Sequence, residues 1–236
     1  MTFSPDHVFV IGVGGTGGHL AAPLARLIAY HPSTQNVPVT FIDGDEFEEN
    51  NLTRQLVGEQ QLGMNKAAAM ADLCKFQGLN NVDFIDDFIT MTKFIPKLNQ
   101  CNSPLIVCSV DNDATRKDII DSISFACKGD YFFITPGNSD GTETVKGQSL
   151  WFGSVGGVAY GLNPALAYAN IENPEDSVPQ KGSCALHAPS RPQLISANFM
   201  AASITLAAIQ NILDGLLKST YSGMFFNLRT LVTSVS

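Results

Sequence analysis

Five glycines lie close together near the N-terminus, in the segment GVGGTGG at residues 12–18. This segment follows an apolar run at 8–13 and precedes a helical pattern, the order of strand, turn and helix in a nucleotide-binding unit. Glycine lets a turn approach phosphate oxygens closely, and the following helix N-terminus adds partial positive charge. We therefore expect a nucleotide to bind over Gly12, Gly14, Gly15 and Gly17.

The alternative for this segment is a close-packed turn between strand and helix that binds no ligand. The pattern of a P-loop is not met, because His19 stands where the lysine of that motif would be.

A carboxylate ends the second apolar run. Asp43 closes the run at 37–43, at the carboxyl end of a predicted strand, where an acid can accept the hydroxyls of a ribose. A capping or solvated carboxylate is the alternative. Asn51, Arg54 and Gln55 follow soon after. A dinucleotide dehydrogenase has no need for these side chains, whereas an enzyme that handles a triphosphate does.

Two cations and a second acid could serve phosphate chemistry. Arg54 and Lys66 are rare cations in an acidic chain, and phosphate transfer needs cations opposite the developing negative charge. Surface cations are the alternative. Asp111 follows the apolar run at 104–110, where a carboxylate can hold Mg²⁺ together with substrate phosphates. Its alternative role is the N-cap of the next helix, for which Asp113 competes.

The elements that must position these side chains alternate between strand and helix up to residue 135. We predict strands at 8–13, 37–43, 82–89, 104–110 and 131–135, and helices at 20–30, 64–76, 92–98 (broken near Pro96) and 113–127. Alternation of this kind predicts an α/β fold with a doubly wound, Rossmann-like parallel sheet. Pro23 fits the first helix only if that helix begins near residue 18 or 19.

The pattern changes after residue 135. Residues 147–154 alternate weakly and favour antiparallel pairing, 194–217 form a long helix, and 224–232 form a final strand. Residues 170–193 have no apolar period and are interpreted as a crossover loop. We expect one domain of 1–236, in which a mostly parallel sheet is extended by antiparallel C-terminal strands. Its halves would be a nucleotide-binding half (1–135) and a partner-binding or dimer half (136–236).

Composition disfavours several classes of protein. The net charge of −8 argues against nucleic-acid binding. No apolar run reaches the roughly 18 residues that span a membrane, and the N-terminus lacks the basic region of a signal peptide. The five cysteines form no CxxC pair, which argues against a structural zinc site and a disulfide framework and favours a cytoplasmic location.

Four motifs together resemble the adenylyltransferase family of ThiF, MoeB, HesA and the ubiquitin-activating enzymes. They are GVGGTGG, FIDGDEFEENNLTRQ, QLGMNKAA and VDNDATR, in the family's order and spacing over roughly residues 7–135. The resemblance implies that ATP lies over the glycine turn, with the ribose on Asp43, the triphosphate at Asn51, Arg54 and Lys66, and Mg²⁺ on Asp111. It implies a homodimer that converts the C-terminal carboxylate of a ubiquitin-like β-grasp protein, typically ending in glycine, into an acyl-adenylate.

The resemblance extends loosely to a cysteine of the crossover loop. In this family such a cysteine can take the acyl group as a thioester or a persulfide, and Cys184 lies in the matching region, near Lys181 and His187. A thiol attacks when it is exposed and its pKa is lowered. An ordinary loop thiol is the alternative for Cys184. Cys74 and Cys108 fall on core patterns.

The chain departs from the family at three places. Asn50 replaces the family's serine, the paired CxxC motifs are absent, and too few residues precede the first strand for the N-terminal helix whose arginine reaches the partner protomer's ATP. Arg26, Arg116 or Arg191 would have to replace that arginine. The small size and the segments GVGGTGG and SCALHAP look most like the ThiF-type proteins of PRTRC plasmid systems.

Three other functions fit part of the chain. An enzyme that adenylates a small molecule or a tRNA base is one, although the acidic charge disfavours tRNA. A non-catalytic scaffold that binds nucleotide is the second, but it would need none of Arg54, Lys66 and Asp111. An NAD-dependent oxidoreductase is the third, and it leaves the segments NNLTRQ and VDN without a role.

Overall fold

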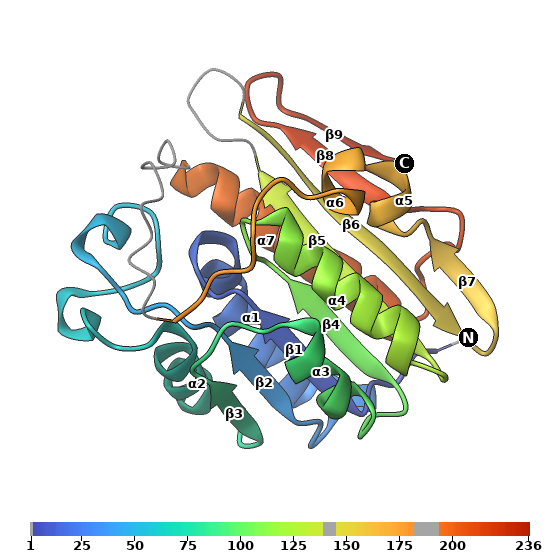
Figure 1. Ribbon diagram of the computed structural model, residues 1–236, viewed down its shortest axis with the longest axis horizontal. Coiled ribbons are helices and arrows are strands. Elements are labelled where there is room, and N and C mark those ends of the chain that lie inside the picture. The colour runs from blue at the N-terminus through green and yellow to red at the C-terminus, as the bar shows by residue number, and fades with distance from the viewer. Residues whose placement is uncertain (1, 139–144, 182–193) are drawn as a thin grey trace.

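The computed structural model describes residues 2–138, 145–181 and 194–236. Its strands form one sheet, shown in Figure 1, whose members are β1 (His7–Ile11), β2 (Val39–Ile42), β3 (Val82–Ile85), β4 (Pro104–Cys108), β5 (Tyr131–Asn138), β6 (Lys146–Val155), β7 (Val158–Gly161), β8 (Gly223–Asn227) and β9 (Val232–Val235). Their order is β3-β2-β1-β4-β5-β6-β8-β9, and β7 pairs with β6. Strands β1 to β5 pair in parallel, and all later pairings are antiparallel. The predicted fold class is confirmed.

Helices cover both faces of this sheet. They are α1 (Gly15–Tyr30), α2 (Lys66–Phe76), α3 (Met91–Leu98), α4 (Asp113–Ala126), α5 (Pro164–Ala167), α6 (Ala169–Glu172) and α7 (Ile195–Leu213), with short 3-10 turns η1 (Pro32–Thr34), η2 (Glu49–Asn51) and η3 (Glu59–Gln61). Helices α1, α2 and α7 belong to one hydrophobic core, and α3, α4 and α6 belong to a second core on the other face. In Figure 1, α3 and α4 lie in front of the sheet.

The central strands are mostly apolar because both of their faces are covered. In β1, Val8 and Val10 enter the first core, whereas Phe9 and Ile11 enter the second. Buried parallel strands show this continuous apolar pattern rather than an alternation. The pattern explains why these strands could be located from sequence.

Two helices differ from the prediction at proline. Helix α1 begins at Gly15, so the expectation that Pro23 requires a start near residue 18 was wrong. The glycine segment itself forms the first turn of α1, and Pro23 lies in the helix interior. There it removes only the N–H that would reach the carbonyl of His19. Likewise, α3 continues through Pro96 without the predicted break.

The C-terminal region differs more. The predicted final strand at 224–232 is a hairpin of β8 and β9, because the chain turns after Asn227. The Asn227 side chain accepts hydrogen bonds from the N–H groups of Arg229 and Thr230, and Leu231 has a φ of 54°. Helix α7 ends at Leu213, with Gly215 in the left-handed region soon after. Strand β7 and helices α5 and α6 were not predicted.

Helix α7 is long and apolar enough to cross a membrane by length and composition alone, although the sequence pattern predicted no run of that length. Half of its apolar stretch is buried, and the helix packs against α1 and the sheet strands β5 and β6. This packing accounts for its apolar composition.

The strand order creates a topological switch point at the carboxyl ends of the parallel strands. The chain proceeds in opposite directions from β1 and from β4, which are neighbours in the sheet. In open α/β sheets, ligands bind at such a switch point, beyond the carboxyl ends of the strands. The glycine segment follows β1 at this point, and the segment after α6 passes across the same edge in Figure 1.

Candidate nucleotide-binding site

The glycines after β1 have different physical reasons to be glycine. Gly12 has a φ of +80°, and a Cβ on Gly17 would lie 2.1 Å from the carbonyl oxygen of Gly12, so packing requires both. A Cβ on Gly15 would lie 2.5 Å from the Asn198 side-chain nitrogen. At Gly14 the nearest atom is the Gln55 side-chain nitrogen, at 3.6 Å. Gly14 is therefore the position of this turn where protein packing leaves room for a ligand.

Asp43 is fixed against this turn. One of its oxygens accepts a hydrogen bond from the Val13 N–H at 2.7 Å, and the other accepts from the Asp45 N–H at 2.9 Å. Burial raises the pKa of Asp43 to about 6, although Lys66 and the two N–H groups act in the opposite direction. Each oxygen keeps a lone pair, so the ionised carboxylate can still accept the hydroxyls of a ribose.

Lys66 begins helix α2 and is buried. Its Nζ lies 3.1 Å from the exposed carboxylate of Asp45. Asn65 caps the helix by accepting the Ala68 N–H, and its amide donates to the carbonyl oxygen of Asp43 at 2.8 Å. Asn65 therefore joins the lysine-bearing helix to Asp43, whose contact with a ribose stays a prediction. This role was not predicted, although Asn directly before a helical pattern is a cap signal.

Arg54 projects from the loop after η2 and is partly buried. Within the described residues its guanidinium makes no hydrogen bond or ion pair, so its charge is uncommitted. The Asn51 side chain, by contrast, forms its hydrogen bonds with residues of its own turn. It accepts the Glu48 N–H at 3.0 Å and donates to the Asn50 side chain at 2.7 Å. Its contact with a triphosphate stays a prediction.

Three buried polar atoms around the turn have no partner in the part of the chain that the structure describes. They are His19 Nδ1, Gln55 Oε1 and Ser109 Oγ. His19 belongs to the first turns of α1, Gln55 lies beside Gly14, and Ser109 lies beside Gly17. Because buried polar groups are almost always hydrogen bonded, unpaired ones at one turn indicate a place where a polar ligand or water completes the structure. This observation fits a nucleotide.

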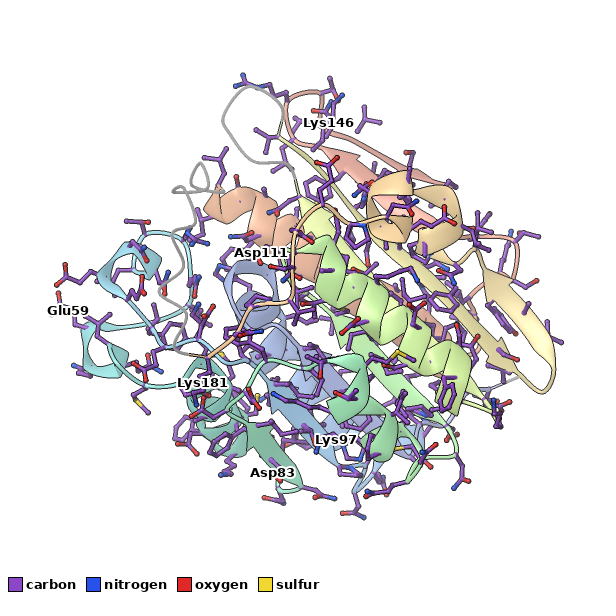
Figure 2. All side chains as sticks on the ribbon, in the orientation of Figure 1. Glu59, Asp83, Lys97, Asp111, Lys146 and Lys181 are labelled. Carbon is purple, nitrogen blue, oxygen red and sulfur yellow. The ribbon has the colours of Figure 1, made fainter. Side chains whose placement is uncertain are left out.

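Asp111 lies beyond the end of β4, next to the start of α4 (Figure 2), and is exposed. Neither Asp111 nor Asp113 is the N-cap of α4, the alternative role that the sequence left open for them. Asn112 takes that role by accepting the Thr115 N–H at 2.8 Å, and Asp113 pairs with Arg116 at 2.7 Å. Asp111 therefore has no structural duty among the described residues and can serve a ligand.

No three acidic, histidine or cysteine side chains form a metal cluster within the described ranges. A Mg²⁺ ion on Asp111 would therefore take its other ligands from phosphate oxygens and water, which is the usual way that this ion binds.

The segment between α6 and residue 181 is pinned across the sheet edge. The Asp176 carboxylate accepts the N–H groups of Asp113 and Ala114 at 2.8 and 2.7 Å. The Lys181 ammonium pairs with the Asp86 carboxylate at 2.5 Å, beyond the end of β3. This segment, residues 173–181, therefore crosses the site region from α4 to β3.

Cys184, His187 and Arg191 lie outside the described residues, so their expected roles stay predictions. The four described cysteines are free thiols, and burial raises the pKa of each: Cys74 and Cys127 to about 12, Cys101 and Cys108 to about 11. Cys74 and Cys108 lie in the core, as predicted. None of these four is suited to act as a nucleophile.

Arg116 was one candidate to replace the N-terminal arginine of the family, but its guanidinium already has partners within its own protomer. It pairs with Asp113 and donates to the carbonyl oxygen of Val110 at 2.5 Å. Arg26 lies over the ring of Tyr30, 5.7 Å from its centroid.

The comparison with protein families gives a direct match. The model of the ThiF family matches residues 3–152, which is more than half of the chain, so the chain belongs to the ThiF family. A curated relative, adenylyltransferase and sulfurtransferase MOCS3-1 of Zea mays, is 29% identical over 126 residues, covering 50% of this chain and 24% of the relative. The chain thus spans about a quarter of that protein's length.

Solved structures share the fold over nearly the whole chain. The crystal structure of E. coli MccB with ATP has a TM-score of 0.62 at 18% identity and covers 98% of this chain and 62% of MccB. MccB with AMPCPP and MccA gives a TM-score of 0.61 at 17% identity, with 98% and 63% covered. PaaA gives 0.59 at 16% identity, also with 98% and 63% covered. The chain therefore spans less than two thirds of these proteins.

Proposed function

We propose that this protein is an ATP-dependent adenylyltransferase that activates a C-terminal carboxylate as an acyl-adenylate. The observation that carries this proposal is the glycine turn, whose open position at Gly14 lies beside the Gln55 side chain, which has a buried oxygen without a partner among the described residues. Asp43 lies at this turn, and Arg54 follows it with a free charge. A relative named as an adenylyltransferase and a solved relative with bound ATP support the same interpretation.

The positions of the charged side chains suggest how the reaction would proceed. A substrate carboxylate oxygen attacks the α-phosphorus of ATP, the new P–O bond forms, and the bond to the β-phosphate oxygen breaks, so that pyrophosphate leaves with the electron pair. Arg54 and Lys66 neutralise the negative charge that develops on the leaving phosphates. Asp111 would hold Mg²⁺, and the bound ion would supply positive charge that stabilises the phosphates. Asp43 orients the ribose, so that the α-phosphorus is presented to the carboxylate.

The partner that we propose is a ubiquitin-like protein that ends in glycine, bound by the half of the chain after residue 135. A second candidate is a different protein or peptide terminus, which the structures of MccB in complex with MccA favour. We further propose a homodimer in the cytoplasm. After adenylation, the Cys184 thiolate would attack the acyl carbon, so that a thioester forms, the bond from that carbon to the phosphate oxygen breaks and AMP leaves.

Exchange of labelled pyrophosphate into ATP tests this function. We expect exchange that requires Mg²⁺ and a partner with a free C-terminal carboxylate. Asp111→Asn should reduce exchange by about a hundredfold or more, because one metal ligand and one charge are lost. Asp83→Asn is the matched control, an exposed carboxylate on β3 (Figure 2) that should exchange as wild type does.

The same assay separates the alternatives. Exchange that survives in Cys184→Ala would place any cysteine step after adenylation. ATP binding without exchange for either class of partner would instead support a nucleotide-binding scaffold. Size-exclusion chromatography with light scattering measures the oligomeric state directly.

A further inference from the structure

Helix α7 carries a fully buried asparagine close to its N-terminus. Asn198 has no exposed surface, and its oxygen accepts hydrogen bonds from the Asn138 amide at 2.7 Å and the Thr16 hydroxyl at 3.4 Å. Its amide nitrogen donates to the main-chain carbonyl oxygen of Arg54 at 3.5 Å. Asn198 therefore contacts the end of β5, the first turn of α1 and the arginine loop at once.

A second side chain holds the same carbonyl from another helix. His19 Nε2 on α1 lies 3.2 Å from the Arg54 carbonyl oxygen. Because a carbonyl only accepts hydrogen bonds, Nε2 carries the proton, and Nδ1 is the bare nitrogen that has no partner among the described residues. The ring lies against Phe199, with centroids 4.2 Å apart, and burial lowers the pKa of His19. The imidazole is therefore a fixed, neutral donor.

The arginine loop needs such support. Residues 52–57 belong to no helix or strand, and the Arg54 guanidinium has no partner among the described side chains. What places this cation is thus its own main chain. Two donors, one from α1 and one from α7, meet at its carbonyl oxygen, and such convergence on one acceptor restrains the loop more than either bond alone.

We propose that His19 and Asn198 are positioning residues that hold the Arg54 main chain, so that its guanidinium stands over the glycine turn and selects the triphosphate of ATP. This inference rests on the proposed function, because it assumes that the turn binds ATP. It adds that α7, which follows the crossover loop, sets the place of the phosphate-binding arginine.

Affinities for ATP and AMP, measured by calorimetry on the full chain, test this inference. Phenylalanine at position 19 keeps the ring but removes the donor. His19→Phe should therefore weaken ATP binding about tenfold, the size expected for a lost hydrogen bond that positions a charge, and change AMP binding by less than about twofold. His19→Gln, whose amide can reach the position of Nε2, should restore ATP binding.

A double-mutant cycle gives the decisive readout. In an Arg54→Ala background, His19→Phe should have no further effect on ATP binding, because its action passes through Arg54. Asn198→Ala should behave as His19→Phe does. Thr205→Val is the control for damage to α7, since Thr205 is buried and bonded to Ser149 and Ala201. It should leave the ratio of ATP to AMP affinity unchanged.

Opposite results are easily recognised. Equal losses for ATP and AMP, additive losses in the double variant, or failure of His19→Gln to rescue would each overturn the positioning role while ATP binding by the wild type stands. A wild-type chain that binds neither nucleotide would overturn the proposed function, and this inference with it.

Discussion

Asp43 combines two opposing demands in one carboxyl group. As a ribose acceptor it should be ionised, yet burial raises its pKa to about 6. Its ordinary pKa is 3.8. Between these two values the folded chain holds the proton more tightly than the unfolded chain does. The stability that Asp43 contributes is therefore full below about pH 4 and is lost as the pH rises through 6.

We expect the pH dependence of stability and of ATP binding to run in opposite directions. From pH 4 to 7, the contribution of Asp43 to the free energy of unfolding should fall by up to roughly 3 kcal/mol. ATP affinity should rise over the same range, because the ionised carboxylate accepts ribose hydroxyls better. Denaturant titrations and calorimetry on wild type and Asp43→Asn measure both.

The side-chain amide of the Asp43→Asn variant does not titrate, so the comparison removes the effect of the phosphate groups, which ionise in the same range. A wild type and variant with parallel pH profiles would contradict this account of Asp43.

At the scale of the element, the glycine turn contains one glycine that protein packing requires and another that leaves room for a ligand. A methyl group on Gly17 would meet the carbonyl oxygen of Gly12 at 2.1 Å, whereas one on Gly14 would meet nothing closer than 3.6 Å. Gly17→Ala should therefore cost several kcal/mol of folding stability, on the order of 3 or more, by overpacking. Gly14→Ala should cost far less and still weaken ATP binding about tenfold or more, by blocking the approach of phosphate.

Thermal unfolding and ATP titration of the two variants check this contrast. If Gly14→Ala bound ATP as the wild type does, the turn would be a packing feature only.

The segment 173–181 is an element whose anchor can be tested separately. Asp176 accepts two N–H groups of the first turn of α4. Replacing it with alanine should cost about 1 kcal/mol, as the loss of a helix cap does. Amide hydrogen exchange at Asp113 and Ala114 should speed up by about tenfold or less, since the opening free energy falls by that amount. Glu175→Ala, an exposed neighbour, is the control. Unchanged exchange in Asp176→Ala would show that this anchor does not hold in solution.

Elements with continuous local patterns were predictable, and long-range polar contacts were not. The strands and helices up to residue 138 were found because each core-facing pattern is carried by neighbouring residues. Asp43 and Asp111 could be placed near one another from the sequence because the carboxyl ends of parallel strands share an edge, and their contacts with a ligand stay predictions.

Asn198 could not be predicted because its partners Thr16, Arg54 and Asn138 are distant in sequence and meet only in the folded chain. The β8–β9 hairpin was missed for a local reason: its turn contains no glycine or proline, and Asn227 forms it through side-chain bonds.

At the scale of the whole molecule, the two main cores lie on opposite faces of one sheet, and the candidate site lies at its switch point. A ligand that binds only the folded state stabilises the entire chain, by about 2.7 kcal/mol at one hundred times its dissociation constant. For a chain of this size that corresponds to a rise in melting temperature of roughly 5–10 °C. The rise therefore reports which nucleotide the site accepts.

We expect ATP with Mg²⁺ to raise the melting temperature by this amount and NAD to leave it within about 1 °C at equal concentration. Both ligands offer a ribose to Asp43, but only ATP offers the triphosphate that Arg54 and Lys66 would neutralise. Arg54→Ala should therefore lose most of the ATP effect while it melts close to the wild-type temperature without ligand, because the guanidinium has no partner among the described residues. If NAD stabilised the chain as much as ATP does, Arg54 and Lys66 would contribute nothing to the choice of ligand. That result would favour an NAD-dependent oxidoreductase over an adenylyltransferase.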